Sequence, residues 1–202
     1  IDEKALEAWA GRLNAREMLM AMLADLIRMT IDDATRFRFP SGEVSQLRGW
    51  DGDLETDEAK GLVPEGKSKW EFGTGPGEKK ATSDYEKRTN QTPDDEMAEN
   101  TLVLVNLGCW DTPTKKIPEW EDDRRKERKW KDVRYIDGVS LVQWLKDHPA
   151  IAARYARNVL GTAPQDGALS TDEYWEEFST QFKPQLSEKL VIADRQREAD
   201  EL

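Results

Sequence analysis

The chain has 202 residues, 37% of them hydrophobic and 35% charged, which suits one domain with a buried core plus appendages rather than two full domains. Its formal net charge of -11 argues against a general nucleic-acid coat protein, which needs a basic surface. A single cysteine excludes an intramolecular disulfide and a cysteine zinc site, and the lack of an apolar run of roughly 18 residues leads us to expect a cytoplasmic protein with no membrane partner.

The first predicted element is an amphipathic helix. Asn14 and Glu17 have the spacing of a capping box, and apolar residues recur behind them at helical spacing, namely Met18, Leu19, Met22, Leu23, Leu26 and Ile27. A short extended segment around Phe37 and Phe39 follows. Two strands are then predicted near residues 48–55 and 67–73, separated by a turn-rich segment, and we expect them to pair as a hairpin.

The second half alternates helices and strands. Helical composition resumes at residues 79–89, after a glycine-rich connector, and the apolar run at residues 101–107 is typical of a strand covered on both faces. We predict that this run is the central strand. The remaining elements are a charged helix at 119–131, a strand at 133–136, and helices at 139–146 and 149–160. This order predicts an α/β sandwich with a mixed sheet.

The C-terminal part of the chain differs in composition. Residues 161–167 have the composition of a linker, and an acidic helical segment is predicted to begin near Thr171. Residues 165–202 contain ten acids and four bases, so the rest of the chain carries a charge of only -5. We therefore expect one domain over residues 1–160, and a linker with an acidic segment over residues 161–202 that leads to a further, downstream domain.

Two acids in the predicted hairpin are candidate metal ligands. Asp51 follows Trp50 on the first strand, and Glu71 lies between Trp70 and Phe72 on the second. Because side chains alternate along a strand, Glu71 should point away from its two aromatic neighbours. Hydrolysis of a phosphodiester at neutral pH needs a divalent metal, and hard oxygen ligands suit Mg²⁺ or Mn²⁺.

Two alternatives stay open for the first acid. Asp53 would share a strand face with Asp51 and is a competing ligand. An aspartate between tryptophan and glycine is also often a turn residue that bonds to nearby backbone amides.

This pattern resembles the PD-(D/E)XK, or restriction-endonuclease-like, nuclease superfamily over roughly residues 15–150. Asp51 and Glu71 match the two acids of its motif in order and context, whereas the lysine position is occupied by Gly73. The resemblance implies a three-layer sandwich in which helices flank a central mixed β-sheet. It also implies a Mg²⁺-dependent (or Mn²⁺-dependent) DNA endonuclease, with Asp51, Glu71 and the Phe72 carbonyl as metal ligands.

The lysine of the motif is expected from the helix after the second acid, as in superfamily members whose lysine has migrated. Lys79, Lys80 and Lys87 are candidates, and Lys80 is preferred because it is near the loop after Glu71. It would orient the attacking water or stabilise the phosphate. Glu43 resembles an auxiliary acid that some members carry.

A glycine at the lysine position leaves a second interpretation open. In that interpretation the chain is a catalytically inactive module with a nuclease fold, used for recognition of nucleic acid or protein and for assembly.

A wider pattern looks like the N-terminal domains of bacterial NTPase-containing antiphage proteins. It consists of Gly49-Trp-Asp-Gly, Ser68-Lys-Trp-Glu-Phe-Gly, Lys80-Ala with Asp84-Tyr and Lys87-Arg, and Trp144-Leu. The resemblance implies an effector nuclease of antiviral defence. The expected partners are DNA as substrate and NTPase or sensor domains downstream in the same polypeptide. A homo-oligomer is a further possible assembly.

Two further features have competing interpretations. The basic segment at residues 124–131 could contact the DNA backbone, but interleaved acids make a solvated helix with internal ion pairs equally consistent. Trp110, Trp120 and Trp130 recur at intervals that fit no single helix or strand face, and we interpret them as core residues rather than base-stacking residues.

Overall fold

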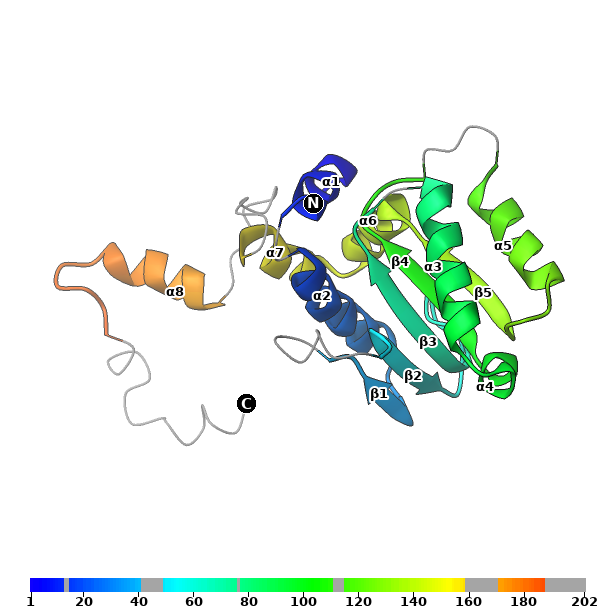
Figure 1. Cartoon of the computed structure of the whole chain (residues 1–202). Helices are drawn as coiled ribbons and strands as arrows, with labels where there is room; N and C mark the ends of the chain where they lie inside the picture. The colour runs from blue at the N-terminus through cyan, green and yellow to red at the C-terminus, as the bar shows by residue number, and fades with distance from the viewer. Residues whose placement is uncertain (13–14, 41–48, 76, 111–114, 159–170, 188–202) are drawn as a thin grey trace.

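The computed structural model describes residues 1–12, 15–40, 49–75, 77–110, 115–158 and 171–187, and its centre is a five-stranded mixed sheet (Figure 1). The strands are β1 (Arg36–Arg38), β2 (Gly52–Thr56), β3 (Gly66–Gly73), β4 (Thr101–Asn106) and β5 (Asp132–Ile136). They follow one another across the sheet in chain order. The first three are antiparallel, and β3, β4 and β5 are parallel, which confirms the predicted α/β architecture with a mixed sheet.

The predicted hairpin is formed by β2 and β3. Gly52 lies opposite Trp70, and Thr56 lies opposite Gly66. Strand β2 begins at Gly52, later than the sequence suggested, so Asp51 lies immediately before the strand.

The prediction that the apolar run at residues 101–107 is the central strand is wrong. Strand β4 is buried along its whole length between β3 and β5, but β3 is the middle strand of the sheet. The physical reason is β1, a three-residue strand that extends the sheet beyond β2. This strand agrees with the short extended segment predicted around Phe37 and Phe39, and its place beside β2 leaves β4 one strand away from the middle of the sheet.

Four helices share the core on one side of the sheet. They are α1 (Glu3–Ala10), α2 (Ala15–Thr30), α6 (Gly138–Asp147) and α7 (Pro149–Asn158). Helices α2 and α6 contact the strands, and the other two pack against α2 and α6. The predicted amphipathic stripe of α2 is buried in the same apolar core as Trp70 and Phe72. Helix α1 was not predicted, and it begins where the Asp2 carboxylate accepts a hydrogen bond from Ala5 N at 2.8 Å.

The opposite face is covered by the helices that connect the parallel strands (Figure 1). They are α3 (Gly77–Gln91), α4 (Asp94–Glu99) and α5 (Ile117–Lys126). Trp120 and Trp130 are buried in the core beneath them, and Trp110 packs against it, which agrees with the core interpretation of these tryptophans. Helix α5 ends before the expected residue 131, and Arg128 adopts a φ of 53° two residues after its last residue.

Helix α8 (Thr171–Thr180) lies apart from the sheet (Figure 1). The linker predicted at residues 161–167 falls outside the described residues. Among the helices that are described, none combines the length and apolar character needed to cross a bilayer.

Candidate functional site

The Asp51 carboxylate lies at the end of the β2–β3 pair, immediately before the first residue of β2. Phe72 N donates a hydrogen bond to Asp51 Oδ2 at 2.8 Å, so the side chain takes the place of a backbone acceptor. Arg16 Nη2, from α2, lies 3.3 Å from both carboxylate oxygens. A turn aspartate would bond to amides close by in the sequence, whereas Asp51 joins two strands and a helix.

Glu71 points toward α3, on the opposite side from its aromatic neighbours. Arg88 donates two hydrogen bonds to Oε2, one of them from Nε at 2.7 Å, and Lys87 Nζ lies 3.3 Å from Oε1. Trp70 and Phe72 belong to the core on the other face. The alternation predicted for β3 is therefore confirmed.

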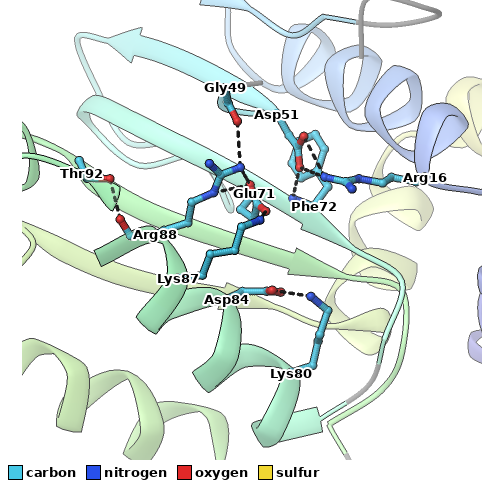
Figure 2. A network of polar contacts seen from close by, with 10 residues as sticks. All are labelled: Arg16, Gly49, Asp51, Glu71, Phe72, Lys80, Asp84, Lys87, Arg88 and Thr92. Atoms are coloured by element: carbon cyan, nitrogen blue, oxygen red, sulfur yellow. Dashed lines mark hydrogen bonds and ion pairs between the residues drawn. The ribbon is translucent and has the colours of Figure 1, made fainter. Parts of the chain in front are cut away.

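We call Asp51 and Glu71 the carboxylate site, and within it each acid has one fixed and one loosely contacted oxygen (Figure 2). The fixed oxygens are those bound by Phe72 N and by Arg88, whose side chain is only 11% exposed. The other two make longer contacts, within the described residues, with side chains that are 58% exposed in Arg16 and 50% exposed in Lys87. Such exposed cationic side chains exchange their partners at low energetic cost.

The two acids also interact electrostatically. Burial raises the pKa of Glu71 above its ordinary value, and the nearby negative charge of Asp51 raises it further, whereas hydrogen bonding and charge from Arg88 lower it. Burial and repulsion outweigh the attraction of the arginine. The carboxylate site therefore remains a place where further positive charge is favourable.

Arg88 ties the chain before Asp51 to Glu71. Its Nη2 donates to Gly49 O at 2.9 Å, and its guanidinium lies 4.5 Å from the centre of the Trp50 ring. The Arg88 side chain thus contacts Glu71 and also Gly49 and Trp50, the two residues that precede Asp51. Arg88 was not among the residues predicted for the site, although it follows the candidate Lys87 in the sequence.

Lys80 occupies the space beside Gly73 and Gly75. Its ammonium pairs with Asp84, one turn further along α3 (Figure 2). Its aliphatic stem passes over the loop, because Cβ atoms built on Gly73 and Gly75 would lie 3.5 Å from Lys80 Cε and 3.3 Å from Lys80 Cγ. Of the three lysine candidates, Lys87 contacts Glu71, Lys80 lies against Gly73, and Lys79 is exposed on the helix surface.

A side chain at Gly73 would displace Asn106. A Cβ there would overlap Asn106 Oδ1 and would lie 3.2 Å from Asn106 Cγ. The glycine at this position thus has a local steric cause, which the sequence did not reveal because Asn106 ends an apolar strand.

Asp53, the competing ligand, belongs to a different group of charges. Its Oδ2 is 2.6 Å from Arg36 Nη2 and 3.4 Å from Lys69 Nζ, and Lys69 also contacts Glu96 at 3.1 Å. We call Arg36, Asp53 and Lys69 the hairpin charge cluster. The Asp53 carboxylate is paired with cations of β1 and β3, whereas Asp51 is contacted from α2 and by the Phe72 amide.

The carboxylate site has no third acid among the described residues. Glu43 lies outside the described residues. Across the described ranges, no group of three or more histidine, cysteine, aspartate or glutamate side chains is arranged to hold a metal ion. The carboxylate site therefore offers two acids and not a closed cage.

The part of the basic segment that lies in α5 is engaged in ion pairs. Arg125 contacts Glu121, Asp122 and Asp132, and Lys126 Nζ lies 2.9 Å from Asp123 Oδ1. These contacts favour the interpretation of a solvated helix with internal ion pairs.

Comparisons with protein-family models, with curated proteins and with solved structures found no match. The functional interpretation of the carboxylate site therefore rests on its geometry and on the sequence pattern.

Proposed function

We propose that this domain is a Mg²⁺-dependent (or Mn²⁺-dependent) DNA endonuclease with a restriction-endonuclease-like fold. The observation that carries the proposal is the carboxylate site. Two buried acids, one immediately before β2 and one on β3, each keep one oxygen fixed, while the other is contacted at 3.3 Å by an exposed cation.

The architecture supports this proposal. The sheet joins an antiparallel hairpin to parallel strands, and helices lie on both faces, which is consistent with a three-layer sandwich. In the nuclease superfamily that the sequence resembles, the two acids of the motif also come from neighbouring chain segments at the sheet.

The donor set fits a hard divalent cation. Mg²⁺ in proteins is commonly bound by one or two carboxylates together with phosphate oxygens of the substrate, so two acids are sufficient. Asp51 and Glu71 would hold the ion, with the Phe72 carbonyl as a further candidate ligand. When bound, Mg²⁺ would supply charge neutralisation at the phosphate and a more acidic water.

The protein residues around the site have separate tasks in this proposal. The Phe72 amide and Arg88 keep the two carboxylates in a fixed orientation. Lys80 would orient the attacking water or stabilise the negative charge that develops on the phosphate. Water would attack phosphorus and release one proton to solvent, while the bond to the leaving oxygen breaks and that oxygen takes up a proton from solvent.

The test is cleavage of a supercoiled plasmid in Mg²⁺ and in Mn²⁺. Asp51→Asn and Glu71→Gln keep the size of each side chain, and either should reduce the cleavage rate by at least about a hundredfold. Asp53→Asn removes the charge of the neighbouring acid in the hairpin charge cluster and should leave the rate within about threefold. Equal losses in all three variants, or cleavage that survives in Asp51→Asn, would contradict the proposal.

A second candidate function is favoured by the cations at the site. Arg16, Lys87 and Arg88 already neutralise both acids, as expected in an inactive module that recognises nucleic acid or protein through the same fold. Isothermal titration calorimetry with Mg²⁺ separates the two functions. The nuclease binds the ion with a heat signal that disappears in Asp51→Asn, and the inactive module gives no such signal.

The biological setting rests on the sequence resemblance alone. We propose that the nuclease is the effector of a bacterial antiphage protein and is controlled by NTPase or sensor domains of the same polypeptide. Phage challenge of cells that express the full polypeptide tests this, because Asp51→Asn should abolish protection if cleavage is the effector activity.

A further inference from the structure

Asn106 is a buried amide without a hydrogen-bond partner in the part of the chain that the structure describes. It is 1% exposed, and both Oδ1 and Nδ2 lack a partner. Buried side-chain amides are nearly always satisfied, since an unmade hydrogen bond in the interior costs free energy. An unsatisfied amide therefore indicates a group that binds there.

The position of Asn106 connects it to the carboxylate site. Asn106 is the last residue of β4 and lies opposite Gly73 in the parallel pairing. Gly73 follows Glu71 by two residues on β3. Ligands of α/β sheets bind at the carboxyl ends of the parallel strands, which is where Asn106 lies.

Lys80 lies on the same side of Gly73 as this amide. The point at which a Gly73 side chain would begin overlaps Asn106 Oδ1 and is 3.5 Å from Lys80 Cε, so the lysine and the amide share one space. The Lys80 side chain is 40% exposed and pairs with Asp84. A lysine of this kind can change its partner without unfolding the helix.

We infer that Asn106 is a phosphate-binding residue that works together with Lys80, an inference that rests on the proposed function. When a DNA backbone phosphate approaches the carboxyl ends of β3 and β4, Asn106 Oδ1 accepts a hydrogen bond from the Lys80 ammonium. Asn106 Nδ2 donates to a non-bridging phosphate oxygen. An amide suits this position because it is a neutral group that can both accept from an ammonium and donate to an anion.

The inference also accounts for Gly73. A lysine on β3 at this position would displace Asn106, whereas glycine leaves room for the amide and for a lysine that arrives from α3. The two changes from the family motif thus belong to one arrangement.

The experiment measures the binding of a short fluorescein-labelled DNA duplex by fluorescence anisotropy, in Ca²⁺ and in EDTA, so that cleavage does not interfere. Asn106→Leu removes both polar atoms at nearly constant volume, and Asn106→Asp keeps the acceptor but adds a negative charge. We expect Asn106→Leu to weaken binding by about fivefold, the effect of one net hydrogen bond. Asn106→Asp should weaken it more, because the carboxylate repels phosphate.

Asn100→Leu is the matched control. Asn100 is a buried asparagine immediately before β4, at the opposite end from Asn106, and its Nδ2 donates to Glu96 O at 2.7 Å. Its replacement should lower the melting temperature and leave DNA affinity unchanged. Asn106→Leu should not lower the melting temperature to the same extent, since it removes no protein hydrogen bond among the described residues.

The possible results separate this inference from the proposed function. Wild-type affinity in Asn106→Leu, in a protein that cleaves DNA, overturns the inference and leaves the nuclease intact. Loss of binding in Asn106→Leu, in a protein that never cleaves DNA, retains the phosphate site and refutes hydrolysis. A wild-type protein that neither binds nor cleaves the duplex overturns both.

Discussion

The β2–β3 hairpin holds two groups of charges that differ in the origin of their cations. In the hairpin charge cluster, Asp53 is neutralised by Lys69, its direct cross-strand neighbour, and by Arg36 of β1. In the carboxylate site, the cations reach Asp51 and Glu71 from α2 and α3. Burial is similar in the two groups, so burial alone does not identify a functional acid.

The two groups of charges differ in how easily their cationic side chains can change partner. A cation supplied by the adjacent strand is held in place by the register of the sheet, whereas a long side chain from a helix can change partner while the helix stays in place. The carboxylate site can therefore exchange Arg16 and Lys87 for metal and phosphate while Arg88 stays in place. The hairpin charge cluster is a stable part of the sheet.

The largest effect on cleavage is expected when Lys80, beside the carboxylate site, is replaced, and Lys69 of the hairpin charge cluster serves as its control. Lys80→Ala should reduce plasmid cleavage by about a hundredfold, because the positive charge nearest Gly73 is lost from the transition state. Lys69→Ala removes the same charge from the hairpin charge cluster and should change the rate by less than about threefold. Initial rates at saturating Mg²⁺ measure both.

Lys87→Ala decides between the lysine candidates. If it abolishes cleavage while Lys80→Ala remains active, the lysine that contacts Glu71 holds the catalytic role and the preference for Lys80 is wrong.

A smaller effect is expected from the two glycines under the Lys80 stem. Gly73→Ala should destabilise the fold by about 1–3 kcal/mol, because its Cβ overlaps the buried Asn106 side chain. Gly75→Ala meets only the flexible stem of Lys80, at 3.3 Å, and should cost less than about 1 kcal/mol. Urea denaturation measures both free energies of unfolding, and equal values would show that Asn106 is not held against Gly73.

A third prediction concerns the charge of Glu71. Its raised pKa means that the folded protein keeps a proton which the unfolded chain releases at lower pH. The free energy of unfolding contributed by this group therefore falls as pH rises above the ordinary glutamate pKa and through the raised value. Glu71→Gln removes this dependence and still offers Arg88 an acceptor.

The measurement is the difference in free energy of unfolding between wild type and Glu71→Gln, from about pH 4 to about pH 7. The free energy of unfolding of Glu71→Gln should increase relative to that of the wild type as pH rises. Glu65→Gln changes an exposed acid and controls for the loss of one charge. A difference that does not vary with pH would show that burial and Asp51 do not act on Glu71 as the geometry indicates.

The sequence predicted the parts of the site that depend on local periodicity. Alternation along β3 placed Glu71 opposite to Trp70 and Phe72, and the hairpin followed from turn residues between two strand patterns. The contacts of Arg88 and Arg16 could not be predicted, because they depend on where α3 and α2 lie over the sheet. The short helices α1 and α4 were missed for a related reason, since neither has enough turns for a clear apolar periodicity.

The smallest effect is expected on α5, where the basic segment had two interpretations. Lys126 is 74% exposed and pairs with Asp123 one turn away, so Lys126→Ala should change stability by less than about 0.5 kcal/mol. If the segment is a solvated helix, DNA affinity should stay within about twofold and its salt dependence should not change. A lysine that contacts a DNA phosphate would instead reduce the slope of log affinity against log salt by about one in the variant. That result would assign DNA contact to α5 as well and would extend the exchange of cation partners beyond the carboxylate site.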